Sequence, residues 1–201
     1  MRGDVLLRAH GITKRFGRRK VLDGAALEAA AGEAVALVGE NGAGKTTLLR
    51  ICAGLERADA GEVGVSGRIG YCPQEPGLLD LLTAGEHLVL FGAAAGLRRA
   101  EAAERGGRLL RELGFAGADA VVSRNLSGGT RQKLNLSLAL LGSPRVLLLD
   151  EPFQGFDYGA YVNFWEHVEA WRRAQMAIVV VTHLLAERSR VDRVVELRAV
   201  R

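Results

Sequence analysis

Residues 39–46, followed by Thr47, have the types and spacing of a phosphate-binding loop, G-x-x-x-x-G-K-[ST]. Glycines let the backbone wrap closely, so that successive N–H groups converge on phosphate oxygens, and a helix that starts there adds the positive end of its dipole. Lys45 supplies a positive charge to the outer phosphates, and the Thr46 hydroxyl ligates Mg²⁺. The predicted nucleotide-binding residues are Gly39, Glu40, Asn41, Gly42, Ala43, Gly44, Lys45, Thr46 and Thr47.

A glycine-rich turn before a helix is the alternative interpretation of this segment. The segment follows the apolar run Ala34–Val38 and precedes a helical run that begins at Thr47, which is the context that the pattern requires. The coincidence of strand, loop, lysine and hydroxyl favours a nucleotide phosphate site.

A second apolar run, residues 146–149, ends in two carboxylates, Asp150 and Glu151. The carboxyl end of a strand in an open α/β sheet is where ligands bind. We predict that Asp150 holds Mg²⁺ together with Thr46, and that Glu151 is the general base that polarises the attacking water. The alternative is that the strand simply leaves the core at two acidic residues. The presence of the phosphate loop makes this alternative less favoured.

A serine and two glycines at 127–129 precede the apolar helical run of residues 134–140. Ser127 is well placed as an N-cap, and the glycines expose backbone N–H groups at a helix start, so this segment is a second candidate anion site. On its own the pattern is weak, because an ordinary capped helix has the same residues.

Short apolar runs alternate with helical stretches, which is typical of an α/β sheet covered by helices. Continuous aliphatic composition predicts buried parallel strands at Ala34–Val38, 146–149 and Ala177–Val181. Shorter strands are expected at residues 5–9, 63–65, 69–72 and 194–197. Helices are expected over residues 86–113, broken near Gly96, and over 161–173. The second of these has an apolar stripe that predicts core packing: Phe164, Trp165, Val168 and Trp171.

The composition is that of an ordinary globular protein: 201 residues, 48% hydrophobic and 25% charged. No apolar run approaches the ~20 residues that span a bilayer, and the first residues lack a signal-peptide pattern, so we expect a cytoplasmic location. Cys52 and Cys72 fit no metal pattern and are expected to be reduced thiols. Five basic residues between 14 and 20 either form a solvated turn or serve an anionic partner such as polyphosphate, nucleic acid or lipid.

The order of these motifs resembles that of the ATP-binding subunits of ABC transporters over nearly the whole chain. Residues 126–130, Leu-Ser-Gly-Gly-Thr, resemble the family's signature motif, lying between the phosphate loop and the Asp150–Glu151 strand. Gln74 matches the Q-loop glutamine, which reaches the metal and the nucleophilic water. His183 matches the switch histidine, which contacts the γ-phosphate. Phe16 lies where the family stacks an aromatic ring on adenine, and Asp157 matches the D-loop aspartate.

The resemblance implies a P-loop NTPase fold with a RecA-like, mostly parallel sheet flanked by helices and a small antiparallel β-subdomain. It implies a single domain over residues 1–201, with a helical subdomain inserted at about 76–130. In the family two such domains pair head to tail, and ATP with Mg²⁺ lies between the phosphate loop of one and the signature motif, here Ser127, Gly128 and Gly129, of the other. The resemblance therefore implies an ATPase that works as a homodimer or pseudo-dimer.

Three features depart from the common family pattern. Thr130 replaces the usual glutamine, the D-loop reads Gly-Phe-Asp at 155–157, and the segment from Lys45 to Gln74 is short, which implies a trimmed antiparallel subdomain. No regulatory domain is expected after the last strand. Glu151 is present, which argues against a hydrolysis-dead site.

The apolar segment 77–88 resembles that of exporter-type subunits and predicts docking of a separately encoded membrane permease, which would hold the protein on the inner face of the plasma membrane. The alternative is that these leucines only pack the small subdomain. Two other functions stay open: a soluble ABC ATPase acting on nucleic acid or ribosomes, and a regulatory nucleotide switch. We expect no nucleic-acid partner, because coiled-coil insertions and zinc modules are absent from the sequence.

Overall fold

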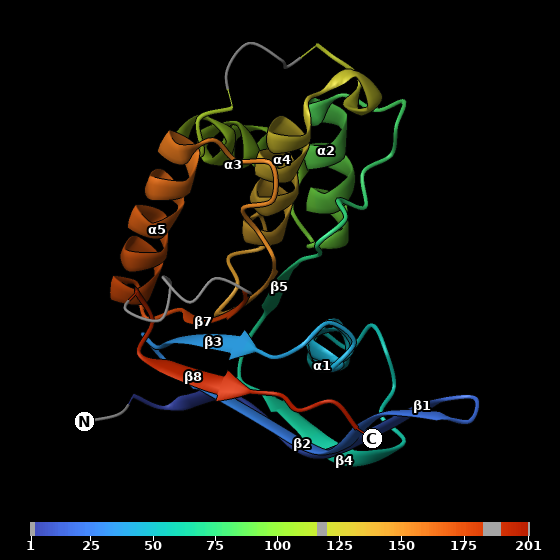
Figure 1. Ribbon diagram of the computed structural model, residues 1–201. Coiled ribbons are helices and arrows are strands. Elements are labelled where there is room, and N and C mark those ends of the chain that lie inside the picture. The colour runs from blue at the N-terminus through green and yellow to red at the C-terminus, as the bar shows by residue number, and fades with distance from the viewer. Residues whose placement is uncertain (1–2, 116–119, 183–189, 201) are drawn as a thin grey trace.

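The computed structural model describes residues 3–115, 120–182 and 190–200, and Figure 1 shows two sheets with a layer of helices above them. The larger sheet has five parallel strands in the order β5-β6-β7-β3-β8. Its strands are β3 (Ala34–Val38), β5 (Ile69–Cys72), β6 (Val146–Asp150), β7 (Ala177–Val181) and β8 (Arg193–Glu196). Every residue of β6 and β7 is buried, because helices or a second sheet cover both faces, as the aliphatic runs predict.

The smaller sheet is antiparallel, in the order β2-β1-β4. Its strands are β1 (Val5–Phe16), β2 (Arg19–Ala30) and β4 (Ala60–Val65). The sequence indicated only fragments of β1 and β4 and gave no prediction for β2. Alanine and glutamate in β2 have low β-propensity, but Leu22, Ala25, Leu27 and Ala29 are buried in the core. Packing therefore overrides local preference here.

The helices are α1 (Lys45–Cys52), α2 (Ala84–Ala94), α3 (Arg99–Glu112), α4 (Gly128–Leu140) and α5 (Tyr158–Arg173), with a short 3₁₀ turn, η1, at Ser123–Asn125. Helix α1 lies between the two sheets (Figure 1). Helices α2, α3 and α4 share a small core that includes Leu88, Leu110 and Leu134. Phe164, Trp165 and Val168 of α5 are buried and Trp171 is partly buried against the parallel sheet, so the predicted core stripe is confirmed.

Cys52 and Cys72 are both buried and form no disulfide, in agreement with the expected reduced thiols. Within the described ranges, no helix combines the length and apolarity needed to cross a membrane.

Candidate nucleotide site

The predicted phosphate loop joins β3 to α1, and its backbone passes close to neighbouring chain segments. Gly44 has φ 94° and caps α1. A Cβ atom at Gly44 would lie 2.7 Å from Leu22 Cδ2, and one at Gly39 would lie 2.3 Å from the Leu197 carbonyl oxygen. Only glycine fits at both positions, because a side chain would collide with the neighbouring segment. At Gly44 the backbone is also in the left-handed region, which favours glycine. The loop is thereby held in a fixed path at the carboxyl end of β3.

Lys45, the first residue of α1, is folded onto this loop. Its Nζ donates to the carbonyl oxygens of Gly39 at 2.9 Å and Glu40 at 3.0 Å, and the residue is only 7% exposed. Burial lowers the pKa of Lys45 from its usual value, while the negative charges of Glu151 and Asp150 act in the opposite direction. The ammonium therefore lies near both predicted carboxylates.

Strand β6 brings Asp150 and Glu151 to the same edge of the sheet as the loop. Asp150 is 1% exposed, whereas Glu151 is partly exposed. Gln74 Nε2 donates to Glu151 Oε2 at 3.1 Å, so the structure joins two residues that the sequence places 77 positions apart. Glu151 has φ 47°, a left-handed conformation that costs a non-glycine residue roughly 1–2 kcal/mol. Such strain is common at functional sites.

The oxygen ligands that the sequence predicts for a metal are compatible with Mg²⁺. They are the Thr46 hydroxyl, the Asp150 carboxylate and the Gln74 side-chain carbonyl, and Mg²⁺ prefers oxygen donors and keeps several waters. Thr46 is exposed at the start of α1, next to Lys45, which is close enough to Asp150 for their charges to interact. The donor chemistry thus fits the ion.

The segment 127–129 forms the first turn of α4. Ser127 Oγ accepts from the Thr130 backbone N–H at 3.3 Å and lies 2.8 Å from Thr130 Oγ1, so the predicted N-cap is confirmed. Thr130, the residue that departs from the family pattern, therefore pairs with Ser127. A Cβ at Gly129 would lie 2.6 Å from the Gly155 carbonyl oxygen, so this turn packs against the loop before α5.

The remaining predicted residues lie on other elements. Asp157 caps α5, with its Oδ1 accepting from the Ala160 N–H at 2.8 Å. Phe16 ends β1, is 50% exposed and carries the Lys14 ammonium 5.0 Å from its ring centre. His183 lies outside the described residues. Within one chain, Lys45, Gln74, Asp150 and Glu151 therefore lie close together. The segment 127–129 does not join them, because α4 begins at the end of the helical layer that is far from α1 (Figure 1).

Two buried side chains that the sequence interpretation missed connect α4 to the Gln74 segment. Asn135 Nδ2 donates to the Pro73 carbonyl oxygen at 2.9 Å and lies 3.2 Å from Cys72 Sγ, and Gln132 Nε2 lies 3.7 Å from the same sulfur. The available signal was Asn135, a polar residue between Leu134 and Leu136 in the apolar part of this helix. The helix that starts at the signature segment is thereby bonded to the residue that precedes Gln74.

His87 was also missed, although it is fully buried. The Leu79 backbone N–H donates to His87 Nε2 at 2.9 Å, and His87 Nδ1 lies 2.8 Å from the Thr83 carbonyl oxygen. Thr83 and Glu86 form a reciprocal capping box at the start of α2. The T-x-x-E spacing was visible in the sequence, and the histidine ties the apolar segment before α2 to that helix.

Fold and motif geometry together define a P-loop NTPase, with a phosphate loop between β3 and α1 and acidic residues at the end of β6. A family model described as "ABC transporter" matches residues 22–154. The chain belongs to this family of ATP-binding cassettes, whose members are ATPases.

Two curated relatives differ in the process they serve. The aliphatic sulfonates import ATP-binding protein SsuB 1 of Pseudomonas syringae pv. tomato is 39% identical over 184 residues, covering 88% of this chain and 66% of the relative. The daunorubicin resistance ATP-binding protein DrrA3 of Streptomyces coeruleorubidus is 35% identical over 196 residues, covering 92% and 62%. The chain thus spans about two thirds of the length of these relatives.

Two solved structures share the fold. The structure of an ATP-binding subunit of an ABC transporter superposes with a TM-score of 0.88 at 30% identity, covering 96% of this chain and 88% of the other. A dimeric, post-hydrolysis ATP-binding cassette, MJ0796, bound to ADP and Pi, superposes with a TM-score of 0.87 at 23% identity, covering 98% and 97%. The second likeness concerns the fold alone.

Proposed function

We propose that this chain binds and hydrolyses ATP in a head-to-tail pair and energises a separately encoded membrane permease. One observation carries the proposal: Gln74, which donates to Glu151 at 3.1 Å, lies between Pro73 and Glu75, and both of these line a surface groove. A partner seated in that groove can therefore alter the position of the catalytic carboxylate. The relatives named for import, SsuB 1, and for resistance, DrrA3, are both consistent with an ATP-binding subunit of a transporter.

The proposed hydrolysis uses positioning and electrostatics. The phosphate loop amides and Lys45 bind the β- and γ-phosphates, and Thr46, Asp150 and Gln74 provide oxygen ligands for Mg²⁺. Mg²⁺, when bound, neutralises charge on the phosphates. Glu151 accepts a proton from the attacking water, and its strained backbone and the Gln74 hydrogen bond fix where its carboxylate points. His183 remains the predicted γ-phosphate contact.

A second chain completes the site in this proposal. Ser127 and Gly128 are exposed at the start of α4, where backbone N–H groups can bind a phosphate held by the partner's loop. Asp157 lies in the adjacent loop, whose Gly155 carbonyl packs on Gly129. The fold likeness to a cassette solved as a dimer supports such a pairing.

The groove has the chemistry of a docking site for a short amphipathic segment. It encloses about 780 Å³, and more of its lining is apolar than polar. Its apolar walls include Leu55, Tyr71, Leu78 and Phe91, and Arg50 and Arg68 supply positive charge. Leu55 and Phe91 are 57% and 38% exposed, so the groove offers apolar surface to a partner. We assign this groove to a cytoplasmic segment of the permease, which would hold the chain at the membrane.

The direction of transport stays a prediction. The sequence interpretation favoured export because of the apolar segment 77–88, yet SsuB 1 is named for import and DrrA3 for resistance. A test is transport into or out of inverted membrane vesicles that contain the assembled complex. ATP-driven accumulation inside such vesicles supports export, and ATP-driven release supports import.

The alternative function, an ATPase that acts on nucleic acid, rests on the five basic residues between 14 and 20. In the structure, less of their charge is free than the sequence suggests. Lys14 is buried and bonded to Glu56 at 2.7 Å, and Lys20 is paired with Asp23 at 2.8 Å. These pairs reduce the charge available to a polyanion. Salt-sensitive binding of RNA or DNA by the purified chain would instead favour that alternative.

The test of the proposed partner is a pull-down from detergent-solubilised membranes. We expect wild type to recover a polytopic membrane protein and Leu55→Glu, which puts a charge in the groove, to lose it. Leu90→Glu is the matched control, because Leu90 is 47% exposed, does not line the groove and lies outside the segment 77–88. Recovery of no membrane protein by wild type, or equal recovery by both variants, would contradict the docking proposal.

A further inference from the structure

The β1–β2 hairpin brings an aromatic ring and a guanidinium to the same face of the small sheet. Phe16 pairs directly with Arg19 across a two-residue turn, Gly17 and Arg18. Gly17 has φ 59°, the left-handed geometry that tight hairpins need at this position. Residues directly opposite each other in an antiparallel ladder project their side chains to one face. Phe16 and Arg19 are therefore neighbours, and both are exposed.

Three of the other basic residues near this turn, Lys14, Arg15 and Lys20, bond within the chain. Lys14 Nζ donates to the Arg57 carbonyl oxygen at 2.7 Å, pairs with Glu56 and lies over the Phe16 ring. Arg15 Nη2 donates to the Arg18 carbonyl oxygen at 3.0 Å. Lys20 is paired with Asp23. Lys14 thus holds the Phe16 ring in place and contributes little free charge to the surface.

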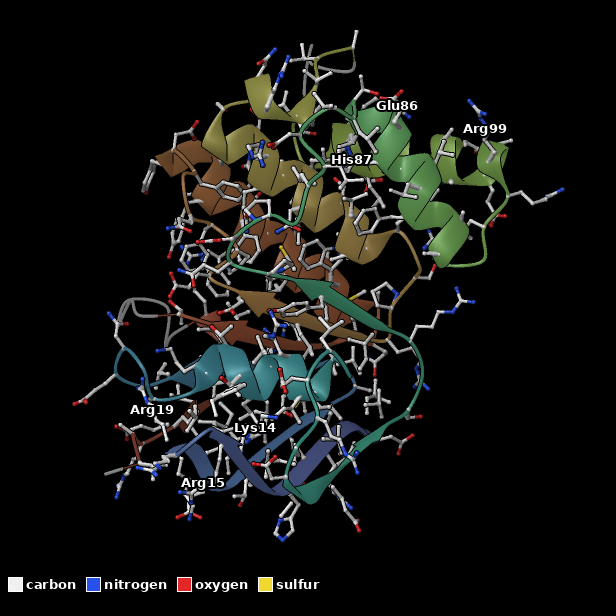
Figure 2. All side chains as sticks on the ribbon, turned by 90° about the vertical axis from the view of Figure 1, so that its right-hand side faces the viewer. Lys14, Arg15, Arg19, Glu86, His87 and Arg99 are labelled. Atoms are coloured by element: carbon white, nitrogen blue, oxygen red, sulfur yellow. The ribbon has the colours of Figure 1, made fainter. Side chains whose placement is uncertain are left out.

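Arg19 differs from these residues, because its guanidinium has no hydrogen bond or ion pair with another residue in the part of the chain that the structure describes. Its Nη2 lies 3.4 Å from the position that a Cβ at Gly42 would occupy, so the side chain rests against the phosphate loop. In Figure 2 Arg19 is labelled beside that loop, while Lys14 and Arg15 lie toward the small sheet. The hairpin thereby extends a cation from the small sheet to the loop of the large one.

The charged side chains around the phosphate loop are mostly acidic, so the Arg19 guanidinium can contribute to phosphate binding there. Lys45 lies near two carboxylates, Asp150 and Glu151, and Glu40 adds a third acidic side chain within the loop. Of these four charged side chains only Lys45 is positive, so Arg19 would add a second protein cation for the phosphates beside any bound Mg²⁺. A guanidinium suits that task, since its planar donors match phosphate oxygens in pairs.

We propose that Arg19 is an additional nucleotide-binding residue, which contacts the polyphosphate bound in the 39–47 loop while Phe16 on the same hairpin contacts the base. This inference rests on the proposed function, because it presupposes ATP in the loop. It assigns to one member of the basic cluster a role that the sequence left open.

The experiment is equilibrium binding of ATP and of AMP to the purified chain, with and without Mg²⁺, by isothermal titration calorimetry. We expect Arg19→Ala to raise the Kd for ATP roughly tenfold and the Kd for AMP much less, because AMP lacks the outer phosphates. Arg19→Lys keeps the charge and should retain part of the affinity. Arg18→Ala is the matched control, one residue away in the turn, and should bind like wild type. The loss should shrink as salt is raised, because salt screens an exposed charge.

Two outcomes would overturn the inference: an Arg19→Ala Kd for ATP within twofold of wild type, or an equal loss for Arg18→Ala. Thermal unfolding of each variant in the absence of nucleotide provides a second readout. An unfolding temperature lowered in Arg19→Ala alone would assign its effect to the fold and also count against the inference. If wild type binds ATP and Lys45→Ala does not, the proposed function stands whatever Arg19 does; if wild type binds no ATP, the proposed function itself fails.

Discussion

The two halves of the candidate site differ in how completely one chain builds them. In the half around the phosphate loop, Lys45 and Asp150 are nearly buried, Lys45 is bonded to the loop and Gln74 is bonded to Glu151. In the half at the start of α4, Ser127 is exposed, and among the described residues its hydroxyl bonds to Thr130 alone. The sheet fixes the first half in advance, whereas the second is a capped helix end that a second molecule can approach.

The largest effect is expected in the buried half. Glu151→Gln should lower steady-state ATP hydrolysis by roughly 10²- to 10⁴-fold, because the proposed general base is lost, while ATP binding is retained. Phosphate release and nucleotide binding are measured on the same preparation. Glu101→Gln, on the exposed face of α3, is the control and should hydrolyse ATP normally. Hydrolysis by Glu151→Gln at the wild-type rate would show that the base lies elsewhere.

A smaller effect is expected where the exposed half meets the loop before α5. Gly129→Ala should lower the free energy of unfolding by about 1–3 kcal/mol, because the new methyl group would lie 2.6 Å from the Gly155 carbonyl oxygen. Gly128→Ala is the matched control, since a Cβ there meets no atom within 4 Å. Urea denaturation compares the two. Equal stability of both variants would mean that the turn and the loop are not packed as described.

A still smaller effect tests the connection between the halves. Asn135→Ala should cost about 1 kcal/mol of stability, because the Pro73 carbonyl oxygen loses a partly buried hydrogen bond at 2.9 Å. It should also lower hydrolysis, since Pro73 precedes Gln74. Ser137→Ala removes a hydrogen bond to the Lys133 carbonyl oxygen within α4 and serves as the control. If hydrolysis is unchanged in a folded Asn135→Ala protein, α4 does not help to position Gln74.

The smallest effect at neutral pH is expected for the reactivity of the two buried thiols, Cys52 and Cys72. Burial raises the pKa of Cys52 to about 12, and burial together with the charge of Asp150 raises that of Cys72. Neither thiol should be alkylated in the native protein at pH 8. Between the ordinary pKa of a thiol and about 12, Cys52 loses its proton in the unfolded chain but keeps it in the folded chain. The free energy of unfolding therefore falls as pH rises through this range, whereas below the ordinary thiol pKa Cys52 does not make it depend on pH. Mass spectrometry after iodoacetamide treatment measures the first effect, and rapid native alkylation would contradict it.

Sequence reasoning succeeded where a residue's chemistry depends on its immediate neighbours. The strands at Ala34–Val38 and Ala177–Val181, and the cap at Ser127, follow from local composition. The helix that was predicted from residue 161 begins at Tyr158, because Asp157 caps it.

Features that depend on distant contacts could not be predicted in the same way. Strand β2 exists because its buried residues pack in the core, and the bond between Gln74 and Glu151 joins segments that only the parallel sheet brings together. The placement of Arg19 against Gly42 likewise depends on how the two sheets meet. Family resemblance identified Gln74 as a candidate, but the residue type alone carries no such information.

The central claim is that the two halves of a working site come from different molecules, and a mixing experiment tests it most directly. Lys45→Ala and Ser127→Arg are each purified and assayed for ATP hydrolysis alone and in an equal mixture. The account predicts that each variant alone is inactive and that the mixture regains activity, because a mixed pair contains one site with an intact loop and an intact signature turn. Wild-type activity of Ser127→Arg alone, or a mixture no more active than its components, would contradict the account.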